Sequence, residues 1–227
     1  WPLPPSRALC EQVVDCLARF HAFWWQDARM EGIPNEDILG DVVAQIPMIA
    51  SGFLDYLGDR FSAERRRIYE TALAALGGLW EHHWKRRIDE RRWITLAHGD
   101  AHFWQFMYPN DGVKDRVYLI DWQVWHIAVG ADDLAYMIAL HWYPERRQQM
   151  ECDLLRRYHD GLLRQGAEGY SWEDLWTGYR VGAIRNLFIP ALFWSMKIGA
   201  GVWWSHLERA MMAFEDLNCA ELLEDHT

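Results

Sequence analysis

Two short apolar segments of this chain each lead into an aspartate. Residues 93–97 (WITLA) are followed by Asp100, and residues 117–120 (VYLI) by Asp121. Between the two segments, residues 110–112 (NDG) are typical of a tight hairpin turn. A hairpin formed there would bring Asp100 and Asp121 to the same end of a small sheet. Two carboxylates in that arrangement can divide the work of phosphoryl transfer, because one can accept a proton from an attacking hydroxyl while the other holds Mg²⁺.

Most of the remaining sequence favours helices. Ser6, Ser62 and Ser171 stand where serine caps a helix, each followed by apolar residues at helical spacing. Pro144 fits the first turn of another helix. The predicted helices are 6–24, 35–46 with a bend at Pro47, 62–87, 132–141, 144–166, one starting at 171, and 205–223. The fold expected from this pattern is mainly α with a small β-hairpin.

Composition indicates one domain over residues 1–227. A chain of 227 residues with 51% hydrophobic residues can bury a substantial core. The net charge of −10 and the lack of a basic stripe argue against a nucleic-acid partner. The longest apolar stretch, residues 187–194, contains Pro190 and is far shorter than the ~20 residues that span a bilayer, so no membrane partner is expected.

The four cysteines lack the Cys-x-x-Cys spacing of zinc or redox sites. Reduced thiols and a cytoplasmic location are therefore the expectation. The sequence gives no indication of the oligomeric state.

Three motifs in order resemble those of a known family. They are HGDAHFWQ at 98–105, IDWQ at 120–123 and GADDLA at 130–135, and residues 17–25 (LARFHAFWW) are similar to a family helix. Through these motifs the chain resembles the aminoglycoside phosphotransferase and choline/ecdysteroid kinase-like family. Its members are small-molecule kinases with a protein-kinase-like (α+β) fold. The resemblance runs from about residue 8 to 140 and implies the helical C-terminal lobe of that fold.

Such kinases begin with a β-rich lobe that carries a phosphate-covering Gly-rich loop and a strand lysine. Neither feature precedes the first predicted helix, so we expect the N-terminal lobe to be absent from this chain. The resemblance further implies ATP as phosphoryl donor, Mg²⁺ as cofactor, and a small-molecule acceptor. A catalytic segment of about 93–140 would be followed by a helical acceptor-binding part of about 144–223.

The resemblance also implies roles for individual residues. Asp100 would be the catalytic base on the acceptor hydroxyl, and Asp121 the metal-holding aspartate. Asp133 would support the catalytic loop by accepting backbone N–H bonds. His98 and His102 flank the loop and would support it too; for His98, bonds to backbone carbonyls are expected. Asp132, beside Asp133, is expected to be exposed.

Gln105 departs from the family pattern. The family usually has Asn five residues after the catalytic aspartate, as a second metal ligand, and Gln carries the same oxygen one methylene further out. Mg²⁺ demands near-ideal octahedral geometry at about 2.0–2.1 Å. Gln105 would therefore shift the metal, bind it through water, or weaken the enzyme.

The acceptor itself stays open between an aminoglycoside, a choline-like amine, a steroid and a sugar. Trp122 and Trp125 follow Asp121 and would either stack on the acceptor or pack the lobe. The apolar, Trp-rich segment 172–204 is predicted to wall the acceptor pocket, which favours a partly apolar or cationic acceptor.

Two other classes of function are retained. A metal-dependent phosphohydrolase could use the ligand types present at His98, Asp100, His102, Asp121 and His126. The order and spacing of the motifs favour the kinase instead. The other class is a catalytically impaired kinase-like module that binds a ligand, which Gln105 and the missing lobe favour.

Overall fold

The computed structural model describes residues 3–33, 38–110 and 116–224. Their helices are α1 (Arg7–Phe23), α2 (Ile38–Leu57), α3 (Ala63–Leu79), α4 (Arg86–Asp89), α5 (Ala131–Leu134), α6 (Pro144–Arg164), α7 (Trp172–Asn186), α8 (Ile189–Ser195) and α9 (Ala200–Asp216). π-Helical segments Trp80–Lys85 and Ala135–Leu140 continue α3 and α5. The strands are β1 (Thr95–Ala97), β2 (Phe106–Met107), β3 (Tyr118–Leu119) and β4 (His126–Ala128).

The predicted helix starts are confirmed where a local cap decides them. The Ser6 and Ser62 side chains accept backbone N–H bonds at the starts of α1 and α3. Ser171 and Asp174 form a reciprocal capping box at α7, and Pro144 opens α6. Pro47 lies inside α2, whereas the predicted cap of that helix, Asn35, lies outside the described residues.

The prediction for the C-terminal region is partly wrong. α8 was not predicted, and α9 begins at Ala200 rather than at 205. Pro190 occupies the first turn of α8, where its missing N–H costs nothing, so the proline starts a helix there rather than interrupting one.

The predicted pairing of segments 93–97 and 117–120 is wrong. β1 pairs antiparallel with β4, and β3 pairs antiparallel with β2 in a separate two-stranded sheet. The hairpin partner of 118–119 is thus 106–107, directly after the Asp100 loop. Of the turn predicted at 110–112, the last two residues lie outside the described part of the chain.

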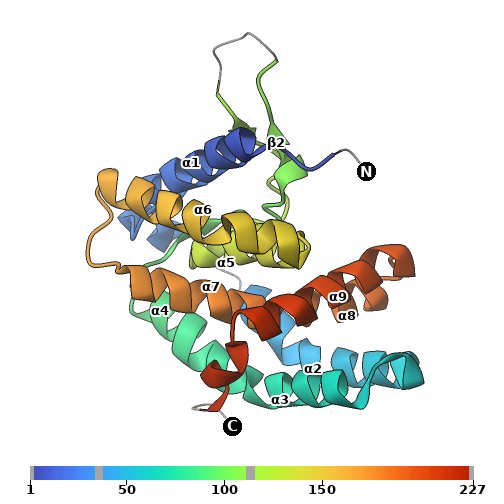
Figure 1. Cartoon of the computed structure of the whole chain (residues 1–227). Helices are drawn as coiled ribbons and strands as arrows, with labels where there is room; N and C mark the ends of the chain where they lie inside the picture. The colour runs from blue at the N-terminus through green and yellow to red at the C-terminus, as the bar shows by residue number, and fades with distance from the viewer. Residues whose placement is uncertain (1–2, 34–37, 111–115, 225–227) are drawn as a thin grey trace.

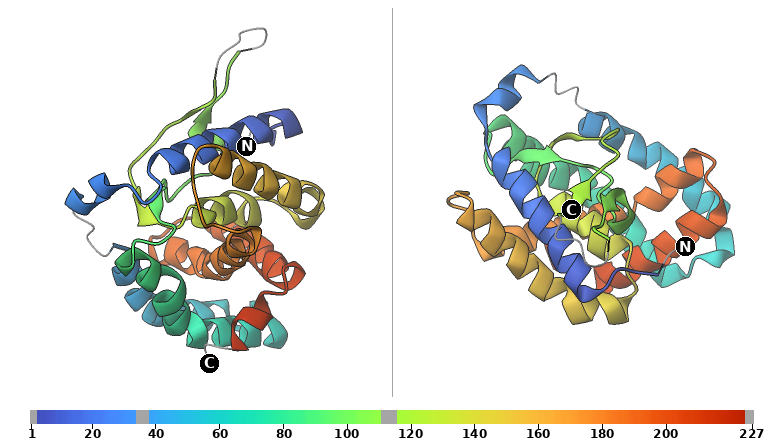
Figure 2. Two further views of the ribbon diagram at one scale, coloured as in Figure 1. Left: turned by 90° about the vertical axis from the view of Figure 1, so that its left-hand side faces the viewer. Right: turned by 90° about the horizontal axis from the view of Figure 1, so that it is seen from above.

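The helices are stacked around a buried central helix (Figure 1). α1 and α6 lie at one end of the stack, α5 and α7 in the middle, and α2 and α3 at the other end. α1 packs along α6, as the view from above shows (Figure 2). Every residue from 131 to 140 is buried, so α5 and its π-helical continuation form the centre of the core and bring Asp133 beneath the loop after β1.

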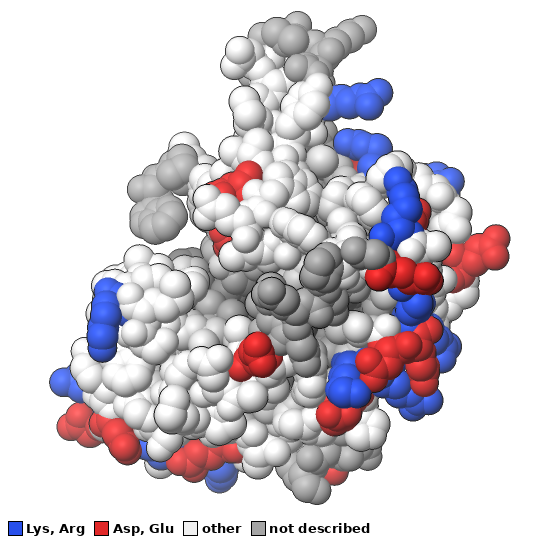
Figure 3. All heavy atoms as spheres, turned by 180° about the vertical axis from the view of Figure 1, so that it is seen from behind, with Lys and Arg blue, Asp and Glu red and all other residues white. Residues whose placement is uncertain are grey.

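No helix among the described residues is long and apolar enough to cross a membrane. On the face shown in Figure 3, Lys and Arg side chains are interspersed with Asp and Glu.

Candidate active site

The loop after β1 is tied to the segment after β3 by the ring of His98. His98 Nε2 lies 2.8 Å from the carbonyl oxygen of Ile120, and Nδ1 lies 3.3 Å from the backbone N–H of Asp100. A carbonyl oxygen only accepts hydrogen bonds, so Nε2 carries the proton and Nδ1 accepts. The expected bond from His98 to a backbone carbonyl is present, and it joins the loop that carries Asp100 to the segment that leads into Asp121.

Asp133 holds the same loop from below. Its carboxylate accepts the backbone N–H groups of His98 at 2.7 Å and Gly99 at 2.9 Å, as expected, and it also lies 3.2 Å from His21 Nε2. Burial acts to raise the pKa of Asp133, but the hydrogen bonds from His21 and the two N–H groups outweigh it and keep the pKa below its usual value. His21 Nδ1 lies in turn 2.8 Å from the Tyr158 hydroxyl. A chain of buried polar groups thus fixes the backbone that carries Asp100.

Gly99 is needed at its position for two reasons. Its φ of +83° lies in the left-handed region, and a Cβ there would lie 2.5 Å from the carbonyl oxygen of Val124. The close approach lets the Asp100 loop pack directly against the segment that follows Asp121.

Asp100 and Asp121 meet at one amide group. Gln105, at the end of the 3₁₀ turn Phe103–Gln105, has its Nε2 2.8 Å from Asp100 Oδ2 and 3.2 Å from Asp121 Oδ2. The Asp100 side chain is 31% exposed, and Asp121 is open to solvent. The structure therefore brings together the three side chains expected at the catalytic centre, although through strand pairings other than those predicted.

The donor set at this point fits a hard cation. Two carboxylate oxygens converge on the Gln105 amide nitrogen, and Mg²⁺ prefers carboxylate and amide oxygens. Gln105 here presents its NH₂ group to both acids, so its oxygen would have to turn inward to act as a ligand. Asp121 has a φ of +65°, a strained backbone conformation of the kind that concentrates at functional sites.

His102 lies beside Asp100 in the wall of a pocket. Its Nε2 is 3.7 Å from Asp100 Oδ2, and its ring centroid is 5.3 Å from that of His141. Burial lowers the pKa of His102, while the Asp100 charge acts in the opposite direction.

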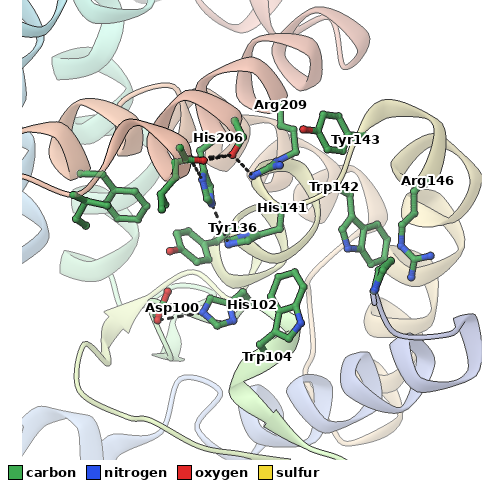
Figure 4. Close-up of a pocket in the computed structure, with 16 residues that line it drawn as sticks. Asp100, His102, Trp104, Tyr136, His141, Trp142, Tyr143, Arg146, His206 and Arg209 are labelled. Carbon is green, nitrogen blue, oxygen red and sulfur yellow. Dashed lines mark hydrogen bonds and ion pairs between the residues drawn. The ribbon is translucent and has the colours of Figure 1, made fainter. Parts of the chain in front are cut away.

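The pocket beside Asp100 has a volume of about 640 Å³ (Figure 4), within the usual range for small-molecule sites. Asp100, His102 and Trp104 line it from the catalytic loop. The other lining residues are Pro4, Tyr136, His141, Trp142, Tyr143, Arg146, Phe193, Ile198, Gly201, Val202, Ser205, His206 and Arg209.

The predicted aromatic wall is only partly found. Segment 172–204 contributes Phe193, Ile198 and Val202 to the pocket, but the tryptophans that line it are Trp104 and Trp142, from outside that segment.

Trp122 and Trp125 do not line this pocket. The Trp122 ring lies 4.7 Å from that of Phe20 and 4.8 Å from that of His98, and its Nε1–H donates to the Leu119 carbonyl. These contacts are those of packing within the lobe, but Trp122 is 36% exposed and Trp125 is 41% exposed, so stacking of either ring on the acceptor stays a prediction.

The expectation that Asp132 is exposed is wrong. It is 2% exposed rather than on the surface, and its carboxylate accepts hydrogen bonds from Trp84 Nε1 at 2.8 Å and from Arg185 at 3.2 Å. Burial raises the pKa of Asp132, although both partners act against this. The sequence contains one signal for the burial of Asp132. Residues 134–140 are almost wholly apolar, and a helix that is apolar on all sides is buried. His21, His141 and His206 were likewise not identified as site residues.

The ligand cluster of a metal-dependent phosphohydrolase is not found. Within residues 3–33, 38–110 and 116–224, no three His, Cys, Asp or Glu side chains converge in a metal-binding arrangement. His98 uses both ring nitrogens in backbone bonds, and His126 Nδ1 lies 3.0 Å from the Val124 carbonyl oxygen. The geometry thus gives that alternative no support.

A family model and a solved structure both agree with the fold described above. The sequence matches the model of the ecdysteroid kinase-like family over residues 4–167. Among solved structures it is similar to choline kinase from Cryptosporidium parvum, with a TM-score of 0.57 and 14% sequence identity. The match covers 96% of this chain and 66% of the choline kinase chain, so this chain spans just under two thirds of that protein's length. No curated protein matches the sequence. The expected mainly helical, kinase-like fold is confirmed.

Proposed function

We propose, since this chain belongs to the ecdysteroid kinase-like family, that it transfers the terminal phosphoryl group of ATP to a hydroxyl group of a small molecule. The observation that carries the proposal is the meeting of Asp100 and Asp121 at Gln105, beside a pocket of about 640 Å³. A transfer reaction needs these two features together, because the acceptor hydroxyl must lie next to both a base and the phosphate-bound metal.

Asp100 is the proposed catalytic base. It lines the pocket, so an acceptor hydroxyl there can donate its proton to a carboxylate oxygen. The N–H bond from Gln105 fixes the orientation of the carboxylate. His98 and Asp133 hold the backbone of the loop, and His102 lines the pocket next to Asp100.

Asp121 is the proposed main ligand of Mg²⁺, with Gln105 beside it. When bound, the ion would neutralise charge on the phosphates. Gln105 must turn its amide to offer an oxygen, and holding it there costs more side-chain freedom than the shorter Asn would lose.

The charges around the pocket disfavour a cationic acceptor. Arg146 and Arg209 line the pocket, and neither forms an ion pair with a carboxylate among the described residues. Among the described residues that line the pocket, Asp100 is the one acidic side chain. A cationic acceptor such as choline or an aminoglycoside would meet repulsion from both arginines. The aromatic walls favour a molecule with an apolar skeleton.

A ligand-binding module with impaired catalysis is the second candidate. The observation in its favour is that Gln105 presents N–H groups, rather than an oxygen, to both carboxylates. The four free cysteines suit a reducing compartment, and a cytoplasmic location remains part of the proposal.

The proposal is tested with the natural full-length protein, Mg²⁺ and ATP labelled in its terminal phosphate. The acceptors are a neutral sterol alcohol, choline and an aminoglycoside. We expect transfer to the neutral apolar alcohol, detected as a phosphate monoester by phosphorus NMR. Binding of that alcohol without transfer to any acceptor would support the impaired module and contradict the kinase.

A further inference from the structure

Two histidines face each other inside the pocket. His141 follows the π-helical segment Ala135–Leu140, and His206 belongs to α9. Their Nε2 atoms lie 3.4 Å apart, as the dashed line between them in Figure 4 marks. Both side chains line the pocket.

The other ring nitrogen of each histidine is already committed. His141 Nδ1 lies 2.8 Å from the Tyr136 carbonyl oxygen, and His206 Nδ1 lies 2.7 Å from the Val202 carbonyl oxygen. Because a carbonyl only accepts, each Nδ1 must carry the ring's proton. In the neutral state both Nε2 atoms are therefore acceptors, and they cannot form a hydrogen bond with each other.

An additional proton between the rings is disfavoured. Burial is the main cause that lowers the pKa of both side chains, and the Arg209 charge acts in the same direction. The pKa of His206 falls to about 4, and that of His141 well below its usual value. Near neutral pH the pair thus presents two lone pairs and no donor, and a buried acceptor left without a donor is costly.

We propose that the pair formed by His141 and His206 is a subsite for a neutral hydroxyl group of the acceptor, which donates its hydrogen bond to the two Nε2 atoms. This subsite rests on the proposed function and narrows its substrate class. Arg209, which lines the same part of the pocket, excludes an ammonium group as the donor.

The subsite takes a hydroxyl other than the one that is phosphorylated. Asp100 lies apart from the pair in Figure 4, so the reacting hydroxyl and the bound hydroxyl occupy different places. Trp104, Trp142 and Phe193 supply apolar surface around them. The acceptor that fits is an apolar molecule with at least two hydroxyl groups.

The test compares two probes by calorimetry, without nucleotide. One is decanediol, with a hydroxyl at each end, and the other is its dimethyl ether, which keeps both oxygens but has no hydroxyl donor. The wild type should bind the diol at least three- to tenfold more tightly, because each hydrogen bond that a hydroxyl donates usually has a net effect of roughly that size.

Variants then assign the preference to the histidines. His206→Asn and His141→Asn keep an amide N–H at the position of Nδ1, so they retain the backbone bond but have no acceptor at Nε2. Each single variant leaves one Nε2 acceptor in place, so the double variant His141→Asn/His206→Asn should lose about three- to tenfold of the preference for the diol. His82→Asn is the matched control, because His82 Nδ1 bonds the carbonyl four residues earlier, at 2.7 Å, as His206 does, but lies outside this pocket. It should keep the full preference for the diol.

Nitrogen NMR of labelled histidines gives a second readout. Both rings should be Nδ1–H tautomers in the free protein, and the diol should shift their Nε2 signals. Equal affinity of the wild type for both probes, no binding of the diol, or an undiminished preference for the diol in the double variant would overturn the subsite. A preference for the diol without any phosphate transfer would refute the proposed function and leave the subsite standing.

Discussion

Gly130 is the position where one added methyl group should damage both stability and the site. It precedes α5 with a φ of −61°, which alanine adopts without strain. A Cβ there would lie 2.4 Å from the Tyr158 hydroxyl oxygen and 2.7 Å from His21 Nδ1. These two atoms are hydrogen-bonded to each other at 2.8 Å in the buried core, so the methyl group must force them apart.

The cost of Gly130→Ala has two parts. Overpacking a tight core costs about 1–3 kcal/mol, and breaking a buried hydrogen bond costs a further ~1–3 kcal/mol. We therefore expect the free energy of unfolding to fall by about 2–6 kcal/mol. Since His21 also contacts Asp133, the loop that carries Asp100 should loosen as well.

Urea unfolding measures this loss as a lower midpoint at an unchanged slope. Gly77→Ala is the control, because Gly77 lies in α3 with no atom within 4 Å of the added carbon; it should stabilise the protein by up to about 1 kcal/mol. Adding Tyr158→Phe to Gly130→Ala removes the nearest oxygen and should recover part of the loss. Wild-type stability of Gly130→Ala, or no recovery in the double variant, would refute the reasoning.

The remaining predictions concern the metal site and pH. Asp121→Ala should abolish the Mg²⁺ dependence of ATP affinity in the full-length protein; calorimetry that finds the same dependence as in wild type would exclude the metal role. Gln105→Asn should tighten Mg²⁺ binding or raise activity, because the shorter side chain loses less freedom; abolished activity would mean that the site is built around glutamine. The depressed pKa of His206 means that the unfolded chain binds a proton, and the folded chain does not, between about pH 6.5 and 4. Stability is therefore fully present above pH 6.5 and should fall as the pH drops through this window, by at most about 3 kcal/mol. His206→Asn should reduce this dependence, and an identical pH profile in both proteins would contradict the assignment.

Local signals in the sequence were reliable because their partners are near in the chain. Ser6, Ser62 and Ser171 each bond a backbone N–H three residues later, so the helix starts could be predicted. The motif around Asp100 and the later Asp133 indicated the loop and its support, which the hydrogen bonds to His98 and Gly99 bear out.

Features that depend on distant packing could not be predicted. β2 and β3 have two residues each, too few to show a periodic pattern, so their pairing was missed. Asp132 is buried because Trp84 and Arg185, some fifty residues away on either side, fold over it. The contact between the His141 and His206 rings depends on where α9 packs, and no motif in the sequence specifies that packing.

The measurement that tests the account most directly is phosphoryl transfer by Asp100→Asn in the full-length protein, with acceptor binding measured on the same sample. The side chain keeps its size but cannot act as a base. The account predicts a rate of transfer to a neutral apolar alcohol about 10²–10⁴-fold below wild type, with the affinity for that alcohol nearly unchanged. A variant that transfers phosphate at the wild-type rate would contradict it.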